Sequence, residues 1–203
     1  MNTTPERLRV IKLGGSLLDW PELPLRFRRW LAAQPAAVNV LIVGGGPLVD
    51  GLRTVDRVHR LSVEASHWLA IRAMSLTAEL TAELLPEARL VDSLDQILRT
   101  PSVPIQILDV EPFLRAEQGS VAALPCGWDV TSDSISAHIA RALAAHDLVL
   151  LKSTLPDVND QGEPKLAGYV DAYFPSAARG LSIRAVNLRD IAFREIALNI
   201  SAA

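Results

Sequence analysis

Val-Ile-Lys-Leu-Gly-Gly-Ser, residues 10–16, is the stretch that decides the fold. An apolar run that carries one ammonium group, on Lys12, leads directly into Gly14, Gly15 and Ser16, and a helical pattern follows. Glycine lets the backbone turn sharply and lets a ligand approach its N–H groups. Backbone N–H groups at the start of a helix point at an anion. The stretch therefore predicts a buried strand, a phosphate-binding turn and a helix.

A second strand and turn repeat this arrangement. The apolar segment 38–43 runs into Gly44, Gly45 and Gly46, and a helical pattern begins at Leu48. Strands that alternate with helices predict a parallel sheet with helices on its faces. Ligands of such sheets bind beyond the carboxyl ends of the strands. We therefore expect an α/β fold with both glycine turns beside one ligand site, although neither turn has the Walker or Rossmann spacing.

A polar turn at residues 128–134, Trp-Asp-Val-Thr-Ser-Asp-Ser, precedes another helical pattern. Thr131 or Ser132 can cap this helix. Asp133 then lies in the first helical turn, where the helix dipole stabilises a carboxylate. Beside a phosphate site, the same carboxylate can instead hold lysine ammonium groups in position. Asp133 taken alone favours the helix-dipole interpretation, and the predicted phosphate site keeps the second one open.

Lysine is scarce in this chain. Lysine and arginine together number 20, and three of these are lysines: Lys12, Lys152 and Lys165. Because arginine serves elsewhere, each lysine marks a candidate position for a compact, flexible ammonium group. Lys152 directly follows a predicted buried strand at 148–151, and Lys165 lies in the polar loop 153–168.

The long helical pattern at residues 61–85 is apolar on more than one side, which indicates burial on more than one side. We expect a homo-oligomer that packs through this helix, with burial inside one chain as the alternative. His67, near its start, is interpreted as structural, with a place beside an acceptor pocket as the alternative. The main apolar stripe consists of Leu69, Ala73, Leu76, Leu80 and Leu84.

Apolar periodicity predicts the remaining elements. Arg26, Arg28 and Arg29 fall opposite the apolar side of a helix near 23–31, so we expect them to face solvent. The tail at 190–200 has helical periodicity. Further helices are expected near 94–98 and 176–179, and further strands at 90–91, 105–108 and 183–186.

Length and charge exclude several classes of protein. We expect residues 1–203 to form one domain, with an acceptor half at about 1–110 and a nucleotide half at about 111–203. The net charge of −3 comes with no basic stripe, which argues against a nucleic-acid partner. One cysteine, Cys126, excludes an internal disulfide framework and a cysteine zinc site. No run reaches the roughly 18 apolar residues of a membrane helix, and no signal-peptide core begins the chain. We therefore expect a cytoplasmic protein.

Taken together, these stretches resemble the amino acid kinase superfamily. The match consists of VIKLGGS at 10–16, IVGGG at 42–46, TSDS at 131–134 and LVLLKS at 148–153. The resemblance implies a three-layer αβα sandwich around a mainly parallel sheet. It also implies transfer of the γ-phosphoryl group of ATP, with Mg²⁺, to a carboxylate, carbamate or phosphate, without a covalent enzyme intermediate.

The branch that phosphorylates phosphate groups is the more similar one. Bacterial UMP kinases have a similar pair of motifs, which in this chain are TSDS at 131–134 and LKST at 151–154. WDVTSDS at 128–134 and SHWLAI at 66–71 resemble the [5-(aminomethyl)furan-3-yl]methyl phosphate kinases of methanofuran biosynthesis. We therefore expect ATP and a small phosphomonoester to give a diphosphate, the acceptor being a furanmethyl phosphate intermediate of a one-carbon carrier. UMP is the alternative acceptor, and it would call for a basic contact near the second turn, where Arg53 is the candidate.

The resemblance also implies roles for individual residues. Lys12, Asp133 and Lys152 would be catalytic, with Lys12 neutralising the transferring phosphoryl group and Asp133 orienting the lysine. No residue is assigned as a metal ligand. The nucleotide would contact Gly14, Gly15, Ser16, Ser153, Thr154 and Lys165, and the acceptor would contact Gly44, Gly45, Gly46, Trp128, Asp129, Thr131 and Ser132.

Two features depart from the superfamily pattern. Many members place a second catalytic lysine in a Gly-Gly-Met-x-x-Lys motif, which this chain lacks, so Lys165 or Lys152 would take that role. Residues 153–170 are also a short connection where relatives carry nucleotide-binding structure. The short nucleotide half would be explained by a different phosphate donor or by a partner protein that completes the site. These departures also keep a second hypothesis open, a non-catalytic member that binds phosphate or another oxyanion.

Overall fold

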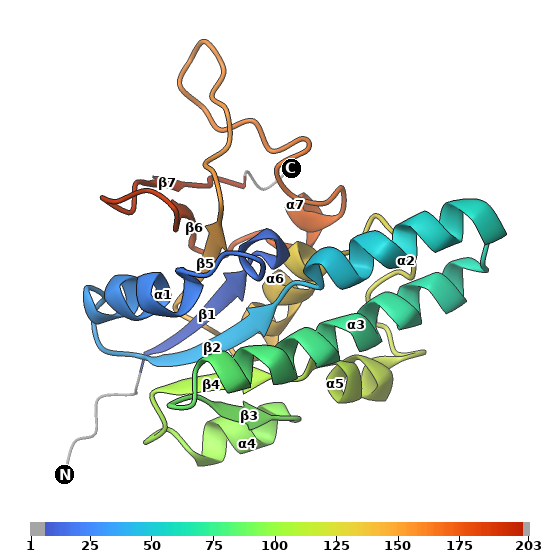
Figure 1. Cartoon of the computed structure of the whole chain (residues 1–203), viewed down its shortest axis with the longest axis horizontal. Coiled ribbons are helices and arrows are strands. Elements are labelled where there is room, and N and C mark those ends of the chain that lie inside the picture. The colour runs from blue at the N-terminus through green and yellow to red at the C-terminus, as the bar shows by residue number, and fades with distance from the viewer. Residues whose placement is uncertain (1–6, 201–203) are drawn as a thin grey trace.

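A seven-stranded sheet runs through the centre of the molecule (Figure 1). The computed structural model describes residues 7–200. The strands are β1 (Leu8–Leu13), β2 (Val38–Val43), β3 (Arg89–Val91), β4 (Ile105–Leu108), β5 (Asp147–Lys152), β6 (Ile183–Asn187) and β7 (Glu195–Ala197). Their order is β3-β4-β2-β1-β5-β6-β7, and all pairs are parallel except β6 with β7.

β1 lies in the middle of the sheet and carries the deciding stretch. Apolar residues on both faces of β1, β2 and β5 are buried, as expected for parallel strands with helices on both sides. Leu13 pairs with Val43 of β2 and Leu151 of β5. Because these three strands end side by side, the turns that follow them meet at one edge of the sheet.

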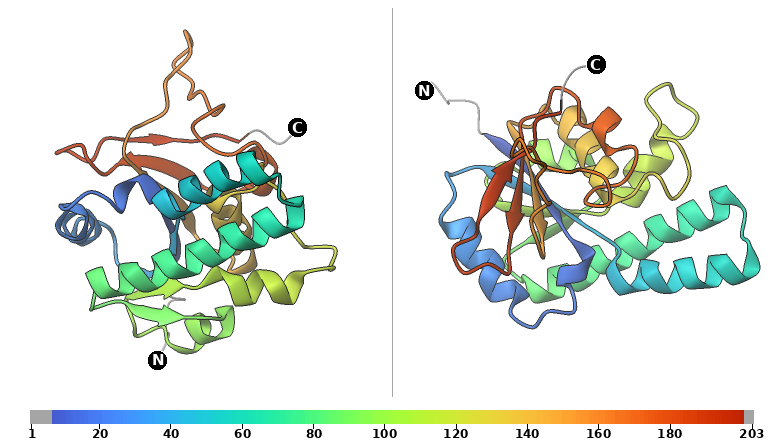
Figure 2. Two further views of the ribbon diagram at one scale, coloured as in Figure 1. Left: turned by 45° about the vertical axis from the view of Figure 1, so that its right-hand side comes forward. Right: turned by 90° about the horizontal axis from the view of Figure 1, so that it is seen from above.

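Helices cover both faces of the sheet (Figure 2). They are η1 (Gly15–Leu17), α1 (Leu23–Ala32), α2 (Gly46–His59), α3 (Val63–Leu84), α4 (Leu94–Arg99), α5 (Val110–Glu117), α6 (Ser132–Ala142) and α7 (Phe174–Ala177). Alternate residues of β1 point to opposite faces, so Val10 joins the core under α6 and Ile11 joins the core under α1. α3 borders both cores, through Met74 and Ala78 respectively. The predicted three-layer αβα sandwich is confirmed.

One arginine of α1 corrects the prediction of a solvent-facing surface. Arg28 and Arg29 are exposed, but Arg26 is buried. Its guanidinium donates to the carbonyl oxygen of Leu188 at 3.3 Å, just after β6, and lies 4.4 Å from the ring centre of Phe193. Burial is tolerated because the charged group has polar partners, and those partners are far away in the sequence.

The predicted helix at residues 190–200 is wrong. Glu195–Ala197 instead forms β7, which pairs with the outer edge of β6. Ala197 lies opposite Arg184, and Glu195 accepts from the Arg184 guanidinium at 2.6 Å. Pairing with an otherwise open sheet edge supplies backbone hydrogen bonds that the periodicity of the tail could not reveal.

α2 and α3 form a hairpin that extends beyond the sheet (Figures 1 and 2). α3 buries Ile71, Met74 and neighbouring small polar residues rather than the predicted stripe. Leu69, Leu76 and Leu80 are exposed, so burial of that stripe inside one chain is wrong. Among the residues described, no helix is both long and apolar enough to cross a bilayer.

Candidate active site

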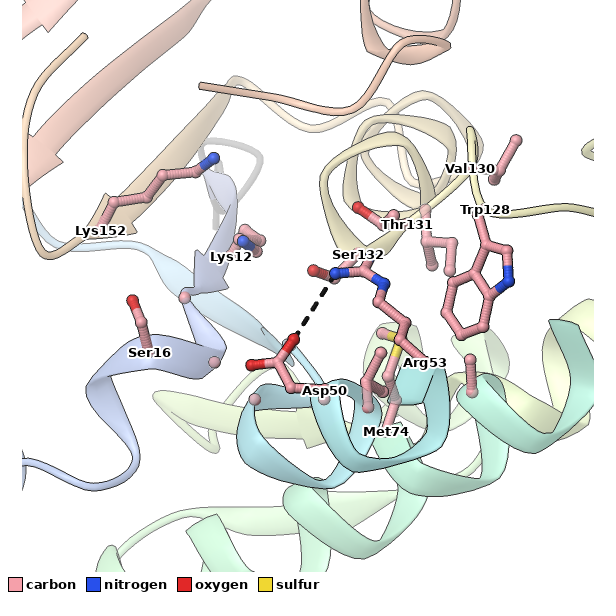
Figure 3. A pocket seen from close by; sticks show the side chains of 18 of the residues that line it. Lys12, Ser16, Asp50, Arg53, Met74, Trp128, Val130, Thr131, Ser132 and Lys152 are labelled. Atoms are coloured by element: carbon pink, nitrogen blue, oxygen red, sulfur yellow. Dashed lines mark ion pairs between the residues drawn. The ribbon is translucent and has the colours of Figure 1, made fainter. Parts of the chain in front are cut away.

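A cavity of about 350 Å³ opens beyond the carboxyl ends of β1, β2 and β5 (Figure 3). Its walls include the turns at residues 14–16, 44–46 and 153–154, one after each strand. Ligands of parallel α/β sheets bind at this edge. Both glycine turns therefore border one cavity, as the sequence predicts.

The two glycine turns pack against each other backbone to backbone. A Cβ atom on Gly15 would overlap the backbone nitrogen of Gly46, and one on Gly44 would lie 2.9 Å from the backbone nitrogen of Gly15. Gly46 also has a φ of +51°, a conformation that glycine adopts readily. Side chains are excluded from this contact, so backbone atoms form this part of the cavity wall.

The amide groups of the two strand-ending glycines are already engaged. The Gly14 N–H donates to the carbonyl oxygen of Leu151 at 2.8 Å, and the Gly44 N–H donates to that of Leu13 at 2.9 Å. These bonds continue the sheet by one residue on each strand. Gly14 therefore shapes the turn, and its amide is not the phosphate donor that the resemblance implied.

Lys12, Asp133 and Lys152 form a continuous chain of ion pairs at the cavity. Lys12 Nζ lies 2.9 Å from Asp133 Oδ1, and Lys152 Nζ lies 3.0 Å from Asp133 Oδ2. The two lysines line the cavity from neighbouring strands, and Asp133 lies behind them in the first turn of α6. The structure thus brings together three residues that lie far apart in the sequence, at positions 12, 133 and 152.

Burial and charge act in opposite directions on this chain of ion pairs. Burial raises the pKa of Asp133, but the Lys12 and Lys152 ammonium groups outweigh it and hold that pKa below its usual range. Burial and the Lys12 charge lower the pKa of Lys152 to about 8, against the opposing effect of Asp133. Two ammonium groups share one carboxylate, so a surplus positive charge faces the cavity when all three are ionised.

The sequence interpretation missed two residues of the connection between β5 and α7. The carbonyl oxygen of Tyr169 accepts from Lys152 Nζ, and the Tyr169 ring centre lies 4.3 Å from that nitrogen. Asp171 accepts from the backbone N–H groups of Thr131 and Ser134, each at 3.0 Å. The sequence predicts Thr131 or Ser132 as the cap of α6. Thr131 takes the capping position but its side chain makes no capping bond, and Ser132 is the first residue of the helix. Asp171 is 37 residues from Ser134 in sequence, so no local pattern pointed to it.

The opposite wall of the cavity is formed by α2, α3 and the segment before α6. Trp128 donates from Nε1 to Asp56 at 2.8 Å, which fixes the indole. The Arg53 guanidinium lies 4.9 Å from the indole ring centre and 3.6 Å from Asp50 (Figure 3). Arg53 lines the cavity, a position that the sequence left open. Apolar side chains complete this wall: Val49, Ala70, Ile71, Met74, Val130 and Ile135.

His67 borders the cavity and also has a structural contact. Its Nδ1 accepts from the Gly127 N–H at 3.4 Å, which ties α3 to the segment that carries Trp128. Burial lowers the pKa of His67, so the ring is neutral near pH 7. Both interpretations of His67 from the sequence are compatible with this position.

The other predicted site residues fall into two groups. Ser16 and Ser153 line the cavity with their hydroxyl oxygens 3.4 Å apart, and Thr154, Thr131 and Ser132 also line it. Asp129 and Lys165 do not line the cavity and are exposed. The Lys165 backbone N–H donates to Asp157 within the loop at 2.7 Å. A lysine at 165 is therefore not positioned to replace the missing second catalytic lysine.

Comparison with known proteins finds relatives by sequence and by fold. A [5-(aminomethyl)furan-3-yl]methyl phosphate kinase from Methanocaldococcus jannaschii is 28% identical over 144 residues, 70% of this chain and 64% of that protein. The match thus spans less than two thirds of the relative's length. UMP kinases from Ureaplasma parvum and Bacillus anthracis share the fold at 12% identity, with TM-scores of 0.63 and 0.65. They are matched over 91% and 93% of this chain and over 91% and 90% of theirs.

The model of the amino acid kinase family matches residues 7–155. That range contains β1, β2, α6, β5 and all three residues of the ion-pair chain. Aspartate kinase from Synechocystis shares the fold as well, at 15% identity and a TM-score of 0.62, over 96% of this chain and 40% of that one. The chain belongs to the amino acid kinase family.

Proposed function

We propose that this protein transfers the γ-phosphoryl group of ATP to a small phosphomonoester and releases ADP and a diphosphate. The observation that carries the proposal is the Lys12–Asp133–Lys152 chain of ion pairs at the cavity that both glycine turns border. Two ammonium groups facing one cavity suit a reaction in which two phosphate groups must approach each other. Membership of a kinase family supports phosphoryl transfer, and the acceptor is the further step.

The chemistry requires positioning and charge rather than a covalent intermediate. An oxygen of the acceptor phosphate would form a bond to the γ-phosphorus as the bond to the β–γ bridging oxygen breaks. Lys12 and Lys152 would neutralise the charge that spreads over the transferring group. Asp133 would hold both ammonium groups in place without contacting phosphate. The acceptor oxygen is already ionised near neutral pH, so no side chain needs to remove a proton.

The donor nucleotide would lie over the first and third turns. Ser16 and Ser153 offer adjacent hydroxyl groups there. At the second turn, on the acceptor side, α2 begins with N–H groups that have no partner inside the helix. Residues 7–200 contain no group of three or more histidine, cysteine or acidic residues that could hold a metal. Mg²⁺ binds phosphates readily and keeps several waters. A magnesium ion would therefore arrive bound to ATP, with phosphate oxygens and water as its ligands. Such an ion would neutralise phosphate charge.

The acceptor would lie against α2, α3 and Trp128. Arg53 offers a cation for an anionic group, and Ile71, Met74 and Val130 offer an apolar wall for a small ring. A furanmethyl phosphate suits this combination, and the relative from Methanocaldococcus jannaschii bears that substrate in its name. UMP remains the alternative acceptor, since Arg53 meets the requirement for a basic contact.

A panel assay tests this proposal. The protein is incubated with ATP, Mg²⁺ and one phosphomonoester at a time, including a furanmethyl phosphate and UMP, and ADP is measured. We expect release of ADP that depends on the furanmethyl phosphate. Release with UMP alone would support the alternative acceptor.

A non-catalytic, oxyanion-binding member is the second candidate, and the position of Lys165 favours it. Lys165 lies outside the cavity. The loop 153–168 therefore supplies no replacement for the second catalytic lysine that many family members have. Tight binding of phosphate in a titration, together with no ADP from any acceptor, would establish this function in place of the kinase.

We also propose that the protein self-associates through the exposed stripe of α3. Leu69, Leu76 and Leu80 are exposed beside Arg72 toward one end and Glu79 toward the other. Two copies packed antiparallel would bury the leucines and bring unlike charges together. Leu76→Glu should shift the mass measured by light scattering to that of a monomer.

Leu98→Glu, at an equally exposed leucine of α4, serves as the control for self-association. A wild-type monomer at micromolar concentration would overturn the proposal. An unchanged mass of the Leu76→Glu variant would overturn it as well.

A further inference from the structure

Asp171 accepts five hydrogen bonds, four from the start of α6 and one from the start of α7. Its Oδ2 accepts from the Thr131 N–H at 3.0 Å, the Thr131 hydroxyl at 2.8 Å and the Ser134 N–H at 3.0 Å. Its Oδ1 accepts from the Ser134 hydroxyl and from the Phe174 N–H at 2.9 Å. A carboxylate with donors on both oxygens is held in one orientation. Asp171 therefore caps α6 from a distant segment of the chain.

The two residues that Asp171 holds at the start of α6 lie on either side of the carboxylate that pairs with both lysines. Thr131 and Ser134 bracket Asp133, which is nine-tenths or more buried and contacts both ammonium groups. Asp133 cannot shift along this turn while its neighbours on both sides are bonded to Asp171. A displaced first turn would carry the Asp133 carboxylate away from two nitrogens at 2.9 and 3.0 Å.

The same segment also reaches Lys152 directly. Tyr169, two residues before Asp171, accepts from Lys152 Nζ with its carbonyl oxygen and covers that nitrogen with its ring. Four groups thus face Lys152: Lys12 from β1, Asp133 from α6, and Tyr169 with Asp171 from the segment before α7. The charges of Asp133 and Asp171 both favour the ammonium form of Lys152.

We propose that Asp171 is a positioning residue of the phosphate site, holding Asp133 and Tyr169 so that both lysines stay aimed at the cavity. The inference rests on the proposed phosphoryl transfer. Asp171 does not line the cavity, so it acts through α6 and through the Tyr169 segment. Through Tyr169 and Asp171, the connection between β5 and α7 can contribute to the site, although it is too short to hold much nucleotide-binding structure.

Asp171→Asn tests the proposal with two readouts. The amide keeps the size of the side chain, but it has one acceptor oxygen and turns an NH₂ group toward other donors. We expect kcat to fall on the order of 10- to 100-fold while KM for ATP and for the acceptor changes little. We also expect the alkaline limb of kcat/KM to move to lower pH, because Lys152 loses a nearby negative charge.

The second readout does not require activity. The chain has three lysines, so ¹³C-labelled lysine gives few Cε signals, and Lys152→Arg assigns the one of interest. In the wild-type protein this signal should titrate near the Lys152 pKa of about 8, and in Asp171→Asn its midpoint should fall. If the wild-type protein forms no ADP, the proposed function fails while this titration still decides the role of Asp171.

Asp109→Asn is the matched control. Asp109 also caps a helix, accepting from the Glu111 N–H at 3.1 Å and from a serine hydroxyl at 2.6 Å, but it lies at α5. The Asp109→Asn variant should leave kcat and the Lys152 titration unchanged. Should Asp171→Asn fail to fold, Ser134→Ala removes one of the five bonds and should give smaller changes in the same direction.

Two results would overturn the proposal. One is an unchanged Lys152 midpoint in folded Asp171→Asn, or in folded Ser134→Ala where the first variant does not fold. The other is a loss of kcat that Asp109→Asn reproduces, since a cap with a purely structural role would give equal losses at both helices.

Discussion

Lys12→Met removes one of the two ammonium groups at the proposed phosphate site while keeping most of the side-chain volume. Lys12 Nζ lies 2.9 Å from Asp133 with both side chains 7% exposed, so water cannot easily replace the lost charge. Removing one preorganised group that stabilises a transition state costs on the order of 10²–10³ in kcat. That factor corresponds to about 3–4 kcal/mol of transition-state stabilisation.

The fold should survive this substitution. Asp133 keeps Lys152 at 3.0 Å, so the buried carboxylate still has a cation. The loss in free energy of unfolding should stay below the roughly 3–5 kcal/mol of a buried pair that is broken outright. Lys152 also loses a like charge, so its pKa should rise above about 8.

Initial rates of ADP formation at saturating ATP and acceptor measure the effect, with thermal unfolding followed in parallel. Arg99→Met, on α4, removes a positive charge from a side chain that is 77% exposed and serves as the control. The control should keep wild-type kcat. A folded Lys12→Met variant with kcat within tenfold of wild type would refute the role given to Lys12.

Three further predictions test other parts of the site. The proposed mechanism requires a protonated Lys152 in the free protein, and the pKa of Lys152 is lowered to about 8. We therefore expect kcat/KM to fall as pH rises through about 8, and a profile flat to pH 10 would contradict this. Gly15→Ala should destabilise the fold because its Cβ would overlap the facing turn, whereas Gly51→Ala, with open space around it, should raise the free energy of unfolding by about 0.5–1 kcal/mol. Chemical denaturation compares the two, and equal effects would speak against the packed turns. Arg53→Ala should raise KM for the acceptor and leave KM for ATP unchanged in steady-state kinetics, and a change confined to ATP would place Arg53 on the donor side.

Local patterns predicted the strands and turns that build the site. β1 and β2 are apolar runs that end where the sequence indicated, directly before glycine. β5 includes the predicted run 148–151 and extends by one residue at each end, to Asp147 and Lys152. Their meeting at one edge follows from parallel topology alone, because strands joined by helices point the same way. That direction places Lys12 and Lys152 at the same edge of the sheet. Their proximity also requires β1 and β5 to be neighbours, which local patterns do not specify.

Contacts between distant segments could not be predicted in this way. Arg26 is buried because carbonyl groups after β6 receive its guanidinium, and β7 forms because β6 has a free edge. Asp171 reaches α6 from a segment that the sequence presents only as a polar connection. Periodicity within one element carries no information on such partners. The division into an acceptor half and a nucleotide half stays a prediction.

Phosphorus NMR of the reaction mixture tests the central claim most directly. The protein, ATP and Mg²⁺ are mixed with a furanmethyl phosphate, and the ³¹P spectrum is followed with Lys12→Met as the comparison. The proposed function predicts loss of the acceptor monoester signal and growth of a pair of coupled diphosphate signals besides those of ADP, far slower in the variant. A spectrum in which the monoester persists with every phosphomonoester tried, UMP included, would contradict it.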